Sequence, residues 1–160
     1  MKVFLATKRL AFGSTITTWQ HVRQLHALGF THIVNLRSSR QFKKKLRSFH
    51  GLWLPFPDDK QPRPRWFYRE ALRLYQHATQ QPESKIFVMC HHGLCRSASL
   101  AYFYLRLSGA SPKKSETFVL KARSRARVVP AYRGSGERFL EHHRTGSKKS
   151  HTKPYSGERR

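Results

Sequence analysis

A cysteine and an arginine stand six positions apart in the segment Cys90–Ser97, directly after an apolar run that ends at Met89. A thiolate is the reactive form of cysteine, and a nearby arginine can bind an oxyanion through two parallel N–H groups. Gly93 lies between them and permits a tight turn. If a buried strand ends at Cys90 and a helix opens at Ser97, the backbone N–H groups of the turn would point at one anion. The segment therefore predicts a phosphate-binding loop with its own nucleophile.

The chemistry of phosphate monoesters explains why these residue types occur together. The ester oxygens are negative, so a nucleophile must attack from within a positively polarised cradle. Arg96 and the loop N–H groups would hold the equatorial oxygens while Cys90 attacks in line with the leaving oxygen. The Ser97 hydroxyl would help the sulfur leave when the phosphocysteine intermediate is hydrolysed. The predicted substrate-binding residues are those of the loop, namely His91, His92, Gly93, Leu94, Cys95 and Arg96.

The leaving oxygen also needs a proton, and the chain has only two aspartates, Asp58 and Asp59. They follow the apolar segment Leu52–Phe56, which reads as a strand. A carboxyl group above the cradle can protonate the leaving group and later activate water. Asp58 is the first candidate for this acid. Asp59 is the alternative, because the sequence does not say which side chain faces the cleft.

Strands alternate with helices along the chain, which predicts an α/β domain with a central, mostly parallel sheet flanked by helices. Apolar runs predict strands at residues 2–5, 10–12, 32–36, 52–56 and 86–89. Apolar residues at helical spacing predict helices at about 17–28, 67–78, 97–107, 112–123 and 131–143. In the first helix, Trp19, Val22, Leu25 and Leu28 would share the buried face. The basic stretch 37–47 would be a loop or short helix, and the Pro-rich residues 58–64 would be irregular.

Composition bounds the partners and the compartment. With 32 Lys and Arg against 8 acids the net charge is +24, which suits phosphorylated substrates or nucleic acid. Residues 1–143 would form one domain, and residues 144–160 a disordered basic tail. Two cysteines, a short apolar start and no membrane-spanning run predict a cytoplasmic protein without membrane insertion. No further Cys/His set has metal-binding spacing, so neither a metal nor a cofactor is expected.

The loop resembles the signature of the cysteine-dependent phosphatases, and over roughly residues 1–143 the chain resembles a small dual-specificity protein phosphatase. This resemblance implies that Cys90 is the nucleophile, that Arg96 binds the phosphate, that Ser97 assists the thiol and that Asp58 is the general acid. The implied reaction is metal-independent hydrolysis of phosphotyrosine, phosphoserine, phosphothreonine or a related phosphomonoester. The family usually has histidine directly before the nucleophile, where this chain has Met89.

Three alternatives accompany this interpretation. The low-molecular-weight tyrosine phosphatases also place a second cysteine before the arginine, but the order Asp58 then Cys90 excludes their fold. The RNA 5′-triphosphatases of the same superfamily resemble the loop in residues 92–94 and are basic, so RNA is the alternative partner, bound through the basic surface and tail. The third alternative is a catalytically weak phosphate-binding pseudophosphatase, because Met89 stands where the family usually has histidine. Cys95 is either a small packing residue or a thiol that forms a reversible disulfide with Cys90.

Overall fold

The computed structural model describes residues 1–39, 44 and 46–149, with the backbone alone for residues 146–149. A five-stranded sheet has the strand order β1-β2-β5-β3-β4. The only antiparallel pair of this sheet is β1 with β2, and the other neighbouring strands run parallel, as predicted. The strands are β1 Val3–Leu5, β2 Leu10–Gly13, β3 His32–Asn35, β4 His50–Trp53 and β5 Ile86–Met89.

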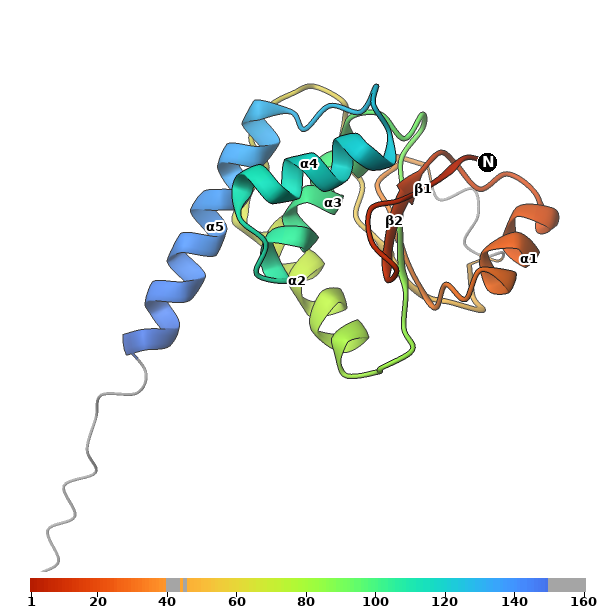
Figure 1. Cartoon of the computed structure of the whole chain (residues 1–160), viewed down its shortest axis with the longest axis horizontal. Coiled ribbons are helices and arrows are strands. Elements are labelled where there is room, and N and C mark those ends of the chain that lie inside the picture. The colour runs from red at the N-terminus through yellow and green to blue at the C-terminus, as the bar shows by residue number, and fades with distance from the viewer. Residues whose placement is uncertain (40–43, 45, 150–160) are drawn as a thin grey trace, which may run out of the picture.

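Helices lie on both sides of this sheet, as the sequence predicts. Figure 1 shows α1 on one side and the other four helices on the opposite side. The helices are α1 Trp19–Ala27, α2 Arg65–Thr79, α3 Arg96–Leu107, α4 Pro112–Ala122 and α5 Pro130–Lys149. Across the described parts of the chain, none of them has the length and apolarity that a membrane crossing requires.

The side chains of β5 alternate between two separate cores, because successive residues of a strand face opposite sides of a sheet. Phe87 and Met89 belong to the core beneath α1, whereas Val88 and Cys90 belong to the larger core beneath α2 to α5. Cys90 therefore emerges on the side covered by α3. That helix is buried along almost its whole length, and its bounds agree with the predicted helix 97–107 to within one residue.

Two predicted features are wrong in detail. Trp19 and Leu28 are 54% and 43% exposed, because the short helix α1 contacts the sheet only through a narrow face with Val22 and Leu25. The predicted strand 52–56 begins and ends earlier, as β4. The regular register with β3 ends at Trp53, although the N–H groups of Leu54 and Phe56 still donate to the carbonyls of Asn35 and Leu36 at 2.9 and 3.4 Å.

The C-terminal helix is longer than predicted. Helix α5 runs to Lys149, so it extends over residues 144–149 of the predicted tail. The sequence prediction ends at His143 because the residues beyond it have no apolar periodicity. Residues 150–160 of the predicted tail, and 40–43 and 45 of the basic stretch, lie outside the described residues.

A half-buried ion pair joins α3 to α5. Arg106 donates from Nε to Glu137 Oε1 at 2.7 Å and from Nη2 to Oε2 at 3.0 Å, and the Tyr102 hydroxyl donates to Oε1 at 2.6 Å. Burial raises the pKa of Glu137, but the hydrogen bonds from Arg106 and Tyr102 outweigh it and leave that pKa below its ordinary value of 4.5. Because the folded pKa is the lower one, the stabilisation is present above pH 4.5 and is lost as pH falls through the folded value.

We expect Glu137→Gln to lower the free energy of unfolding by about 2 kcal/mol at neutral pH, because Arg106 then stays buried without a counter-charge. Urea unfolding at neutral and acid pH measures the effect, which should shrink below pH 4.5. Glu116→Gln is the matched control, since its pair with Arg133 is 36% to 40% exposed and should contribute under about 0.5 kcal/mol. Equal losses in the two variants would contradict this prediction.

Candidate active site

The loop between β5 and α3 surrounds the Cys90 sulfur with hydrogen-bond donors. The backbone N–H of Gly93 donates to Cys90 Sγ at 3.2 Å, and Ser97 Oγ lies 3.2 Å from the same sulfur. Ser97 is fully buried and Cys90 is 3% exposed. Both residues stand where the sequence predicted them, at the end of a buried strand and in the first turn of a buried helix.

Five consecutive carbonyl groups of this loop have partners in its surroundings. Thr15 Oγ1 donates to the carbonyl oxygens of Cys90 and His91 at 3.1 and 3.4 Å. Arg123 Nη1 donates to those of residues 92 and 93 at 2.6 and 2.8 Å. The backbone N–H of Arg127 donates to the carbonyl of residue 94 at 2.8 Å.

The directions of these carbonyls determine where the amide groups of the loop point. In a planar trans peptide, each C=O is opposed by the N–H of the next residue. Five carbonyls held by outer partners therefore turn the N–H groups of residues 91–95 towards the other side of the loop, where Gly93 already meets the sulfur. Such a concave row of N–H groups binds anions.

Gly93 lets this loop pack directly on β2, and Gly13 lets the residue before β1 approach β2. Gly93 has φ +68°, and a Cβ atom there would lie 2.6 Å from the backbone carbon of Gly13. A Cβ atom on Gly13 would in turn lie 2.0 Å from the carbonyl oxygen of Lys2. Larger residues fit at neither position without moving the backbone, so this contact fixes the height of the loop above the sheet.

The Arg96 side chain is 11% exposed and is held by main-chain carbonyls. Its Nη1 donates to the carbonyl oxygens of Phe56 and Leu36 at 3.1 and 3.5 Å. Its buried Nε has no hydrogen-bond partner among the described residues, and lies 3.9 Å from Asp58 Oδ2. A buried N–H group without a partner is costly, so this donor is suited to an anionic ligand.

The two aspartates have different surroundings. Asp59 Oδ1 accepts hydrogen bonds from Arg63 Nη2 at 2.5 Å and from the Gln61 N–H at 2.9 Å, and these bonds lower the pKa of Asp59. Asp58 is 47% exposed and faces Arg96. The structure thus engages Asp59 within its own loop and leaves Asp58 beside Arg96.

Helix α5 holds the aspartate loop in place. Lys60 has the left-handed backbone angle φ +57°, which is unusual for a residue with a side chain, and its N–H donates to the Tyr132 hydroxyl at 2.9 Å. The N–H of Arg63 donates to Ser135 Oγ at 3.1 Å, and its guanidinium lies over the rings of Phe56 and Tyr132. Residues 72 positions apart in sequence therefore position the candidate acid.

The other loop residues line the mouth of the site. His91 and His92 are exposed, with ring centroids 4.2 Å apart. The pKa of His91 is lowered first by the charge of His92 and then by burial. The charges of Arg37 and Arg96 lower it further. Leu94 and Cys95 are half-buried. Burial, followed by the charges of Asp58 and Cys90, raises the pKa of Cys95, which favours the thiol form and a packing role over a reactive one.

Sequence reasoning missed the residues that hold the loop from outside. Thr15, Arg123 and Gly13 come from segments far from the loop in sequence, and no local motif marks them. A rim of solvated charge is the usual interpretation of a basic stretch such as 123–127. The structure instead places the Arg123 guanidinium against two loop carbonyls and 4.4 Å from the centre of the Phe4 ring.

We expect Arg123→Ala to lower kcat/KM for an aryl phosphate by about 10- to 100-fold, because the peptide planes of the loop lose the donor that orients them. Affinity for vanadate should fall in parallel, whereas the Tm should change little. Lys121→Ala, which removes an exposed cation two residues earlier, is the matched control. An Arg123→Ala variant with the kinetics of this control would show that the loop is oriented without Arg123.

A family model for the "Swiss Army Knife protein, DSP-PTPase phosphatase domain" matches residues 3–154. The chain belongs to this phosphatase family. No curated protein matches this chain in sequence. Among solved structures, PTPMT1 has a TM-score of 0.76 and 14% identity, covering 92% of this phosphatase and 99% of that chain. Human DUSP28 has a TM-score of 0.75 and 21% identity, covering 91% and 99%. The active form of Tk-PTP has a TM-score of 0.64 and 21% identity, covering 88% and 94%.

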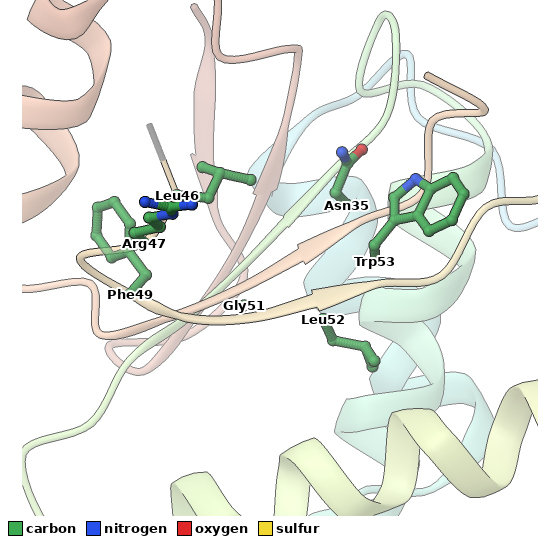
Figure 2. A pocket seen from close by; sticks show the side chains of 7 residues that line it. All are labelled: Asn35, Leu46, Arg47, Phe49, Gly51, Leu52 and Trp53. Carbon is green, nitrogen blue, oxygen red and sulfur yellow. The ribbon is translucent and has the colours of Figure 1, made fainter. Parts of the chain in front are cut away.

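One pocket of the phosphatase lies at the edge of the sheet, and another lies beside the loop. One, of about 330 Å³, reaches the last residues of β3 and β4. Figure 2 shows Asn35 and Trp53 on the same side of these strands, with Leu52 pointing to the opposite side. Trp53 Nε1 donates to the carbonyl of Arg37, the residue whose charge reaches His91. The second, of about 380 Å³, adjoins the loop directly and is lined by Leu94, Cys95, Ser124, Arg125, Ala126 and Arg127.

Proposed function

We propose that this phosphatase hydrolyses phosphotyrosine, phosphoserine, phosphothreonine or a related phosphomonoester through a phosphocysteine intermediate. One observation carries the proposal. The carbonyl groups of residues 90–94 all accept hydrogen bonds from outside the loop. The N–H groups of residues 91–95 therefore converge on the side where the Cys90 sulfur lies. A nucleophile inside a cradle of N–H groups fits phosphoryl transfer, because the cradle neutralises the oxygens that would repel the attack.

In the proposed first step, the Cys90 thiolate attacks phosphorus as the bond to the leaving oxygen breaks. Arg96 and the loop amides bind the three equatorial oxygens, which spread the charge of the transition state. They supply the positive charge at the phosphoryl group, so no metal ion is assigned to this step. In the second step, water attacks the phosphocysteine, and the hydrogen bond from Ser97 Oγ stabilises the departing sulfur.

Asp58 is the proposed general acid. Its carboxyl group lies 3.9 Å from Arg96 Nε, over the residue that binds the phosphate. In the first step it donates its proton to the leaving oxygen, and in the second it accepts one from the attacking water. The engagement of Asp59 by Arg63 and Gln61 supports giving this role to Asp58.

Hydrolysis of p-nitrophenyl phosphate between about pH 5 and pH 8, with EDTA present, tests the proposal. We expect turnover that vanadate inhibits competitively, because vanadate takes up the geometry of the transition state. Burst release of p-nitrophenol would identify the covalent intermediate. Folded wild-type protein that binds vanadate without any turnover would instead support the pseudophosphatase alternative.

The basic pocket beside the loop favours a second candidate, an RNA 5′-triphosphatase. Arg125 and Arg127 are exposed there, next to Leu94 and Cys95. Cations at this position would suit a substrate whose reacting phosphate is followed by further phosphates. Release of the terminal phosphate from triphosphorylated RNA, persisting in Asp58→Asn, would favour this candidate. Turnover of phosphopeptides but not of this RNA would exclude it.

A further inference from the structure

Three histidines gather at the end of the sheet opposite to Cys90. His32 and His50 are the first residues of the parallel strands β3 and β4 and are paired in register. His77 belongs to the last turn of α2. Cys90 follows the last residue of β5, so the length of the strands, about 13 Å, separates the two places. The cluster is therefore distinct from the phosphatase site.

The ring nitrogens of these histidines converge. His32 Nε2 lies 2.8 Å from His77 Nδ1, and one nitrogen from each of the three rings lies within 4.8 Å of the others. Two imidazoles on one tetrahedral zinc ion have nitrogens about 3.3 Å apart, given bonds of about 2.0 Å. His50 and His77 are exposed, so a small ring movement would exchange the His32–His77 hydrogen bond for bonds to the ion, whereas His32 is fully buried.

Two neighbouring features suit a cation. Thr31 Oγ1 lies 2.8 Å from His32 Nδ1, so it can accept the proton of that nitrogen and leave the Nε2 lone pair towards the cluster. Metal-binding histidines commonly have such a partner on the second ring nitrogen. The C-terminal end of α2, where His77 stands, carries the negative end of the helix dipole.

We propose that His32, His50 and His77 bind one zinc-class divalent ion, with the fourth coordination position open to water. Imidazole is a preferred ligand of Zn²⁺, and a three-histidine set is an established zinc-binding type. The ion would link β3, β4 and α2, which makes its expected effect a stabilising one. The net charge of +24 opposes any bound cation, so the site should select ions with high affinity for nitrogen over Mg²⁺ or Ca²⁺.

The test uses the full chain without a histidine tag and with both cysteines replaced, Cys90→Ser and Cys95→Ser, so that no thiolate competes for metal. Calorimetric titration with Zn²⁺ should give one tight site. His50→Ala and His77→Ala, each in the same background, should weaken that site at least tenfold. His142→Ala, which removes an exposed histidine of α5, is the matched control and should not change it.

Two further readouts identify the ligands and the consequence. Co²⁺ should give the visible absorption of a tetrahedral ion without a thiolate charge-transfer band. Free Zn²⁺ at about 100 times Kd should raise the Tm by about 5 to 10 °C, and not in the His50→Ala, His77→Ala double variant. Tight binding that survives in this double variant, or no tight binding at all, would overturn the proposal. Neither outcome bears on turnover of p-nitrophenyl phosphate, which is measured with EDTA present.

Discussion

Cys90→Ser is expected to lower the turnover of p-nitrophenyl phosphate by at least about four orders of magnitude. Serine keeps the size of the side chain and its place below Gly93, but a hydroxyl at neutral pH is not the anionic nucleophile that a thiolate is. The cradle itself is unchanged, because its carbonyls are held by Thr15, Arg123 and Arg127 and not by the sulfur. Steady-state kinetics measures the loss.

The same variant should still bind vanadate or a phosphopeptide, which separates the role of the sulfur from that of the loop. Cys95→Ser is the matched control. It changes the other cysteine of the chain, which is half-buried and held as a thiol, and it should retain most of the activity. If Cys95→Ser rather than Cys90→Ser removes turnover, the proposed nucleophile is wrong.

Asp58→Asn should lower kcat by about 10²- to 10⁴-fold for phenyl phosphate, because an amide cannot supply the proton that the phenolate needs. The loss should be smaller for p-nitrophenyl phosphate, since p-nitrophenolate leaves more readily without a proton. Steady-state kinetics with the two substrates measures both losses.

Asp59→Asn separates proton transfer from support of the loop. It weakens the bond to Arg63 and should reduce kcat only modestly for both substrates, without dependence on the leaving group. The comparison between the two substrates is decisive because a merely structural change lowers both rates alike. A leaving-group effect found in Asp59→Asn and not in Asp58→Asn would reverse the assignment.

The parts of the site that lie close together in sequence could be predicted from it. Cys90, Gly93 and Ser97 fall in one octapeptide, and the apolar run before it and the helical spacing after it determine the local geometry. The candidate general acid could be narrowed to Asp58 or Asp59 because the chain has only two aspartates. Strand alternation also explains why residue 89 is the apolar Met89: its side chain lies in the core on the opposite side of the sheet from Cys90.

The parts that depend on tertiary packing could not be predicted. Nothing around Arg123 in the sequence indicates that its guanidinium reaches two loop carbonyls. The proposal of Asp58 rather than Asp59 as the general acid rests on Arg63, which binds Asp59 and whose N–H donates to Ser135. The three histidines at the start of β3, the start of β4 and the end of α2 have no regular spacing, and only the sheet register brings two of them together.

The anchoring of the aspartate loop by Tyr132 and Ser135 has a consequence for synthesis of the protein. A ribosome makes the chain from its N-terminus, so Asp58 and Cys90 leave the exit tunnel before helix α5 exists. An emerging chain therefore holds Cys90 and Asp58 but lacks the two hydroxyl groups that fix the aspartate loop. The enzyme should acquire its activity only when its last helix has packed against the aspartate loop.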